Sequence, residues 1–209
     1  VWTTTPWTLT SNVAAAVGPE LDYVRVRQGE KVLYLSKGTL SILQGEFQID
    51  GELKGSAMEG WRYRGPFDEL PAQISSGAPD AHRVILWDEV GEEEGTGIVH
   101  IAPGAGAEDY QLGKQHGLPV IAPLNESGVF VADFDWLTGM PVSETARPIY
   151  QKLVEKGLAY SLRDYVHRYP KCWRCSTELV FRLIDEWFLK ADEIRPLMIE
   201  AARKVRWIP

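Results

Sequence analysis

The sequence lacks several features that define common classes of protein. No run approaches the roughly 18 consecutive apolar residues that a membrane-spanning helix needs, so we expect no membrane role. Only two cysteines are present, which excludes a secreted disulfide framework and favours a cytoplasmic protein. A Gly-x-Ser-x-Gly elbow, a phosphate-binding loop and a His-Glu-x-x-His helix are also missing. The sequence therefore carries none of the common hydrolase or nucleotide-binding signatures.

Positive charge is scarce as well. The 209 residues include 22 Lys and Arg against 29 Asp and Glu, a formal net charge of −7. Because phosphate binding depends on clustered cations that release counterions, this balance argues against a free-standing nucleic-acid-binding protein. The sequence opens at Val1 without Met or a signal peptide, so we expect it to be a segment of a longer protein.

Short apolar runs separated by turn residues fill the first 140 residues, and this pattern predicts many short strands. The clearest is a hairpin of residues 23–27 and 31–35. Further strands are expected at 2–5, 45–49, 83–87, 97–101, 120–121 and 129–131. We predict an α+β fold that is mainly β with peripheral helices and barrel-like. Residues 1–160 would form this domain, and residues 161–209 a connecting arm with a C-terminal helix.

Three helices are expected from their end signals. One covers 107–115, with acidic residues in its first turn and Gly117 past its end. A second covers 143–156, with Ser143 as its cap and Gly157 as its stop. A third covers 191–205, where Pro196 favours a later start.

The first candidate site is the run from Trp2 to Asn12, which holds five threonines, a serine and an asparagine. In a strand, Thr3 and Thr5 would face one side and Thr4 the other. Their hydroxyls both donate and accept hydrogen bonds, so they can orient a water, a ribose hydroxyl or an ester carbonyl without charge. An ordinary β-branched edge strand explains the same pattern.

The second candidate site is the glycine-rich stretch 95–110, which predicts a strand, a bend and a helix start. Small residues let a ligand approach the backbone, and first-turn amides favour an ionised Asp109 that can bind an ammonium group. His100 lies near the strand's end, where it can hydrogen-bond a substrate. Purely structural roles for His100 and Asp109 remain open.

The arm contains a possible metal site and a mixed basic and aromatic surface. Cys172 and Cys175 supply two of the four ligands that a structural zinc needs. His167 is a possible third ligand, or the remaining ligands lie outside this sequence, or no metal binds. Basic residues alternate with aromatic ones over 163–182, which suits either a nucleic-acid strand or stacking on the protein itself.

Four motifs together resemble the editing domain of isoleucyl-tRNA synthetases, the insertion called connective polypeptide 1. They are WTTTPWTLTSN at 2–12, GTGIVHIAPGAGAEDY at 95–110, YPKCWRCSTEL at 169–179, and EWF at 186–188 with VRWIP at 205–209. Their order and spacing match over nearly the whole chain. The run PWTL at 6–9 is similar to the isoleucine enzymes rather than their valine and leucine relatives. Thr10, where many relatives have proline, and the small Ala105 depart from the pattern.

This resemblance implies a deacylase that removes valine wrongly esterified to tRNA(Ile), with no cofactor for editing. It implies catalytic roles for Thr4, Thr5, His100 and Asp109, with Asp109 also holding the substrate's α-ammonium group. Further substrate-binding residues would be Thr3, Trp7, Asn12, Ala102 and Gly104. The implied partners are the tRNA(Ile) 3′ end carrying valine and the rest of the parent synthetase. The resemblance also implies a possible structural zinc on Cys172 and Cys175, completed by ligands outside this sequence.

Two alternatives stay open. The domain could position the tRNA 3′ end without catalysis, or it could edit in a valyl- or leucyl-type enzyme. The editing hypothesis requires that the threonine-rich strand and Asp109 face each other across a cleft.

Overall fold

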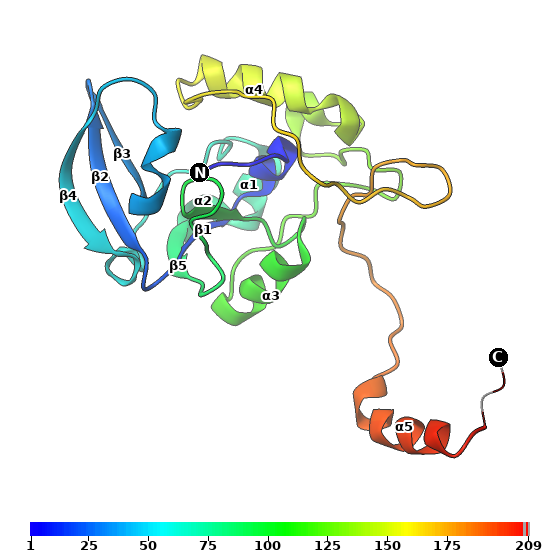
Figure 1. Cartoon of the computed structure of the whole chain (residues 1–209). Helices are drawn as coiled ribbons and strands as arrows, with labels where there is room; N and C mark the ends of the chain where they lie inside the picture. Colours follow the sequence, from blue (N-terminus) through cyan, green and yellow to red (C-terminus); the bar gives the residue numbers. More distant parts are fainter. Residues whose placement is uncertain (207, 209) are drawn as a thin grey trace.

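The computed structural model describes residues 1–206 and 208, in which two three-stranded sheets are surrounded by short helices (Figure 1). In the first sheet, β1 (Ala14–Val17) lies between a parallel β5 (Arg83–Leu86) and an antiparallel β6 (Ile98–Ile101). The second sheet is antiparallel, with β2 (Asp22–Gln28) between β3 (Lys31–Ser36) and β4 (Gln48–Lys54). The predicted α+β class is confirmed.

The predicted barrel is wrong, because the described strands form two separate sheets rather than one closed one. The expected strands at 120–121 and 129–131 do not form, and that region holds only isolated bridges such as Leu124 to Phe130 and Val129 to Pro141. The β2–β3 hairpin is confirmed, with Tyr23 opposite Ser36 and Gln28 opposite Lys31.

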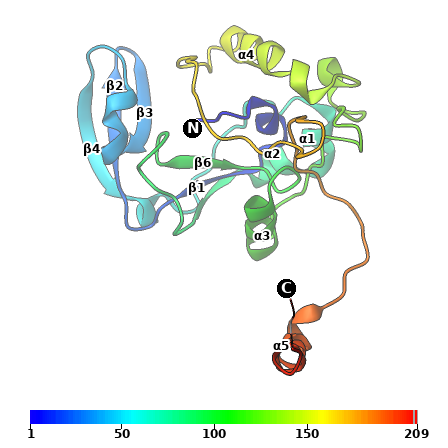
Figure 2. The same cartoon turned by 45° about the vertical axis from the view of Figure 1, so that its right-hand side comes forward.

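The core surrounds the first sheet. All four residues of β1 are buried, so this strand contacts protein on both faces. In both views α3 (Ala107–His116) and α4 (Ala146–Glu155) lie on opposite sides of this sheet (Figure 2). The short helices α1 (Pro71–Ser76) and α2 (Ala78–Ala81), which the sequence pattern did not predict, follow each other around Gly77. At the end of this sheet, Val13 bonds Ile101, so the end of β6 lies beside the chain that leads into β1.

The three predicted helices are present; α3 starts at Ala107 as predicted, and the other two start later. α3 ends at the left-handed Gly117 as expected. The expected cap at Ser143 is wrong, since residues 142–144 form a 3-10 turn and α4 starts at Ala146. α5 (Arg195–Arg203) starts late because Pro196 occupies its first turn, where a missing amide costs nothing.

The predicted strand at 2–5 is also wrong. Residues 1–5 are irregular, and Pro6–Ser11 forms a 3-10 helix, hereafter the threonine helix. The threonine hydroxyls explain this, because Thr8 Oγ1 donates to the Thr5 carbonyl at 2.8 Å and Thr10 Oγ1 to the Trp7 carbonyl at 2.7 Å. Such local bonds to the backbone compete with strand pairing, and Pro6 suits a first helical turn.

Beyond α4 the chain first runs back across the domain, where the Tyr165 ring packs edge-on against Trp2, and then follows an extended path to α5, which lies apart from the sheets (Figure 1). Large apolar side chains in this stretch are exposed, among them Trp173, Trp187 and Phe188. The domain boundary at residue 160 stays a prediction. Trp207 and Pro209 of the last sequence motif lie outside the described residues. Among the described residues, every helix is too short or too polar to cross a lipid bilayer.

Candidate functional site

The two predicted motifs meet at the threonine helix and the end of β6. Strand β1 brings them together, since the Val13 amide donates to the Ile101 carbonyl at 2.9 Å and Ala15 pairs with His100. His100 Nε2 then lies 3.0 Å from Thr8 Oγ1. A hydroxyl from the threonine-rich segment and the imidazole of the glycine-rich motif are therefore in direct contact.

The protonation of His100 follows from its neighbours. A carbonyl only accepts, so the single hydroxyl hydrogen of Thr8 is committed to Thr5 O, and Thr8 Oγ1 must accept from His100 Nε2–H. Burial lowers the pKa of His100 to about 4. The ring is neutral near pH 7. Its Nδ1 is then a lone-pair acceptor, and that atom is buried without a hydrogen-bond partner in the described chain.

Asp109 lies at the other end of the same stretch. Its Oδ2 accepts a hydrogen bond from the Ala102 amide at 2.8 Å, which fixes the start of α3 against the residue that follows β6. Burial raises the pKa of Asp109 to about 6, opposed by the Ala102 amide. Above pH 6 the site therefore contains a partly dehydrated carboxylate, a suitable partner for an ammonium group.

The glycine-rich bend between them is held by close backbone packing. A Cβ built on Gly104 would lie 1.8 Å from the Ile121 carbonyl oxygen, so no larger residue fits without movement of the chain. Gly104 and Ala102 are both buried. The small residues of this motif thus allow protein to contact protein, and a ligand contact at Gly104 or Ala102 stays a prediction.

The remaining predicted residues have different surroundings. Thr3 Oγ1 accepts from the Thr5 amide at 2.9 Å, and Thr4 is exposed. Trp7 is buried in the main core. Two surface hollows lie elsewhere, one along α5 and one beside Arg27 and Gln48, so the cleft between Thr4 and Asp109 stays a prediction.

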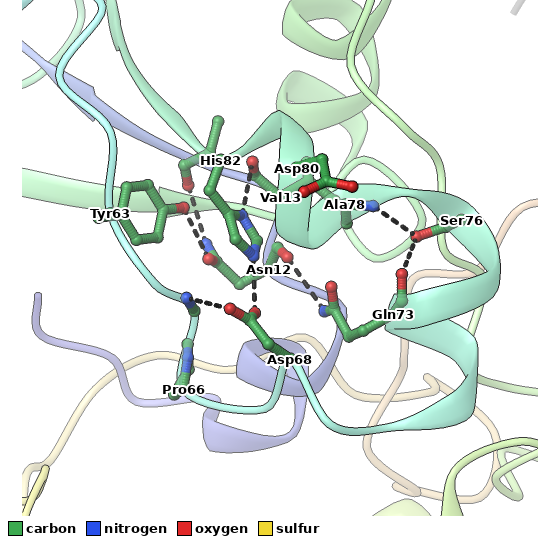
Figure 3. A network of polar contacts seen from close by, with 12 residues as sticks. Asn12, Val13, Tyr63, Pro66, Asp68, Gln73, Ser76, Ala78, Asp80 and His82 are labelled. Carbon is green, nitrogen blue, oxygen red and sulfur yellow. Dashed lines mark hydrogen bonds and ion pairs between the residues drawn. The ribbon is translucent and has the colours of Figure 1, made fainter.

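Asn12 is the centre of a polar network that the sequence analysis missed (Figure 3). Its Oδ1 accepts from the Tyr63 hydroxyl at 2.7 Å, and its Nδ2 donates to the Ala14 carbonyl at 2.8 Å. Gln73 Nε2 donates to the carbonyls of Thr10 at 2.8 Å and Asn12 at 3.0 Å. The contacts of Asn12 with Tyr63 and Gln73 join residues more than 50 positions apart, which no local pattern reveals, and a substrate contact at Asn12 stays a prediction.

Cys172 and Cys175 fit half of a structural zinc site. Hydrogen bonds to Thr177, with a smaller contribution from Cys172, lower the pKa of the Cys175 thiol to about 7, which favours the thiolate that binds metal. The described part of the chain contains no group of three His, Cys, Asp or Glu side chains placed to hold a metal. His167 instead stacks on Tyr165, so it does not complete a site with the cysteines.

Comparison with known proteins gives matches to isoleucine–tRNA ligases over the whole of this chain. The chain is 41% identical over 210 residues to isoleucine–tRNA ligase of Methanothermobacter marburgensis and 42% identical over 221 residues to that of Pyrococcus horikoshii. It is 39% identical to the Clostridium tetani enzyme over 209 residues. Each match covers all of this chain but only 20% of the relative. No family model matches the chain.

Two solved structures share the fold. The crystal structure of GlLeuRS-CP1 matches with a TM-score of 0.54 and 15% identity, covering 78% of this chain and 83% of that one. The editing domain of the P. knowlesi cytosolic leucyl-tRNA synthetase matches with a TM-score of 0.53 and 12% identity, covering 74% of this chain and 80% of that one. At these identities the likeness concerns the fold alone.

Proposed function

The chain belongs to the isoleucyl-tRNA synthetase family, about a fifth of whose length it spans, and from this premise we propose that it is the editing domain that hydrolyses valine esterified to tRNA(Ile). The observation that carries the proposal is a pair of hydrogen bonds two residues apart. Thr8 bonds His100, and Asp109 bonds the amide of Ala102. Hydroxyls, a neutral imidazole and an anion are thereby attached to the same short stretch of chain.

This set of groups suits hydrolysis of an aminoacyl ester. The ester is already activated, so a positioned water, helped by the neighbouring ribose hydroxyl, reacts without a protein nucleophile. Asp109 would bind the α-ammonium group of the amino acid, and Thr3, Thr4 and Thr5 would surround the ester and the terminal adenosine. His100 would line the pocket for the amino-acid side chain. These roles account for the missing catalytic triad.

The selectivity for valine has an energetic reason. One methylene is worth only about 1–3 kcal/mol in a hydrophobic pocket, and isoleucine against valine is itself the known example of this limit. The site of the synthetase that attaches isoleucine to tRNA therefore also accepts valine too often for accurate protein synthesis. A second pocket that admits valine and excludes isoleucine removes the error.

The proposed partners, the 3′ end of tRNA(Ile) and the rest of the synthetase, follow from membership of the family. A net charge of −7 gives the chain little general attraction for RNA, so the rest of the synthetase would hold most of the tRNA. Cys172 and Cys175 would provide two thiolates to a structural zinc whose other ligands lie elsewhere in the parent enzyme. Such a zinc would stabilise the arm and take no part in hydrolysis.

The test compares the deacylation of tRNA(Ile) charged with valine, threonine or isoleucine. The rate is measured as the release of labelled amino acid. We expect valine to be released much faster than isoleucine. Equal rates for all three would contradict the assigned specificity. Saturable tRNA binding without any release would favour a domain that only positions the 3′ end.

A further inference from the structure

Four side chains outside the proposed site hold the joint between the threonine helix and β1. These residues, called the junction clamp, are Tyr63, Asp68, Gln73 and His82. Tyr63, Gln73 and His82 bind the chain from Thr10 to Val13, and Asp68 bonds His82 (Figure 3). The same joint leads on one side to Thr8 and on the other, through β1, to His100.

The centre of the clamp is the contact between His82 and Asp68. His82 is fully buried, with Nδ1 3.0 Å from the Val13 carbonyl oxygen and Nε2 2.8 Å from Asp68 Oδ1. Asp68 Oδ2 also accepts from the Gly65 amide at 2.9 Å. Both imidazole nitrogens therefore lie against oxygen atoms, so the ring is held at two opposite edges.

Close packing leaves this pair no freedom. A Cβ built on Gly65 would lie 2.2 Å from Asp68 Oδ1 and 2.6 Å from His82 Nε2. The Tyr63 ring stacks on the His82 ring with centroids 4.9 Å apart. A buried polar pair adds little stability compared with apolar residues of the same size, and its best-attested benefit is a fixed geometry.

The clamp reaches the proposed site through Val13. Its carbonyl is held by His82, and its amide donates to Ile101, the neighbour of His100. Tyr63 fixes the adjacent Asn12 through the amide side chain. The position of the threonine helix relative to β6 is thus set where the clamp binds.

We infer that Tyr63, Asp68 and His82 are positioning residues that set the Thr8 hydroxyl against His100 Nε2 and so fix the orientation and the tautomer of the His100 ring. The effect on catalysis rests on the proposed editing function. The effect on the geometry of His100 does not.

Two substitutions break the clamp and one preserves it. Tyr63→Phe keeps the stacked ring and removes only the bond to Asn12. Asp68→Leu removes both carboxylate bonds. Asp68→Asn keeps them, because the amide oxygen can accept from Gly65 while its NH₂ donates to a neutral His82. Tyr34→Phe and Asp50→Asn, on the second sheet, are the matched controls.

The readouts are the kinetics of valyl-tRNA(Ile) hydrolysis and the imidazole ¹⁵N signals of His100. For Tyr63→Phe and Asp68→Leu we expect kcat to fall on the order of tenfold with KM changed less than about twofold, as misplacement of reacting groups predicts. The His100 signals should change from one tautomer to a mixture. Asp68→Asn and both controls should retain wild-type values.

Unchanged kcat and unchanged His100 signals in folded Tyr63→Phe and Asp68→Leu would overturn the inference, even if both variants lose thermal stability. The hydrolysis is measured in the parent synthetase that contains this chain, and if that enzyme hydrolyses no valyl-tRNA(Ile), the proposed function fails. The ¹⁵N signals still decide whether the clamp sets the geometry of His100.

Discussion

Thr8 determines which nitrogen of His100 carries the proton. The two residues are 92 positions apart in sequence, yet Thr8 Oγ1 lies 3.0 Å from His100 Nε2 and has already given its own hydrogen to Thr5. His100 must therefore donate through Nε2 and present Nδ1 as an acceptor. The positions of the Thr8 hydroxyl hydrogen and the His100 ring hydrogen follow because the Thr5 carbonyl can only accept.

Replacing Thr8 with valine tests this relationship. Thr8→Val keeps the shape but leaves the Nε2–H group of His100 without an acceptor, which costs about 1–3 kcal/mol for a buried polar group. We expect the free energy of unfolding in urea to fall by that amount. Thr96→Val, which removes a half-buried hydroxyl with one long bond of 3.3 Å, should cost less. Equal losses would argue that the Thr8–His100 bond is unimportant.

The pKa of His100 gives a second prediction. Because burial lowers it from 6.5 to about 4, the unfolded chain binds this proton at higher pH than the folded protein. This contribution to stability is complete above pH 6.5 and is lost as the pH falls toward 4. An NMR titration should show His100 neutral at pH 5.5. A midpoint near 6.5 for His100 would be incompatible with the buried, singly bonded ring.

Asp109 should have the opposite linkage. Its pKa is raised from 3.8 to about 6, so the folded protein binds the proton more tightly, and the ionised carboxylate costs stability above pH 6. Asp109→Asn should therefore raise the free energy of unfolding at pH 7.5 by about 1–3 kcal/mol, at 1.36 kcal/mol for each pKa unit. Thermal denaturation at pH 7.5 and 3.5 measures this. The gain should vanish at pH 3.5, and the exposed Glu108→Gln should show none at either pH.

Gly104 tests the close packing behind Asp109. Gly104→Ala places a methyl group within 1.8 Å of the Ile121 carbonyl oxygen, and forcing the two segments apart should cost at least about 1–3 kcal/mol. Gly91→Ala is the matched control, since its Cβ meets nothing within 4 Å. Denaturant midpoints of the two variants decide the point. Similar midpoints would show that the bend at 104 tolerates a side chain.

The fold was predictable wherever short-range patterns determine it. Alternation and a turn at Gly29 specify the β2–β3 hairpin, and the acidic first turn and Gly117 specify α3. The strand expected at 2–5 does not form and the threonine helix after it was not predicted, because β-branched residues favour strands unless their hydroxyls bond the preceding turn, as Thr8 and Thr10 do.

The candidate site was predictable only in part for a related reason. Asp109 and His100 could be chosen from their places beside a helix start and a strand end. The partner that determines the protonation of His100 could not be predicted, because Thr8 contacts His100 only after β1 pairs with β6. No sequence pattern indicates a role for the clamp residue His82, because its contacts with Asp68 and Val13 exist only in the folded chain.

The most direct test of the account is hydrolysis of valyl-tRNA(Ile) by the wild-type protein, Asp109→Asn and Glu108→Gln. If Asp109 binds the substrate's ammonium group, losing its charge should remove about 2–4 kcal/mol of binding, or on the order of 100-fold in kcat/KM. Glu108→Gln, an exposed neighbour on the same helix turn, should stay within about twofold of wild type. A folded Asp109→Asn protein that deacylates valyl-tRNA(Ile) at the wild-type rate would contradict the account.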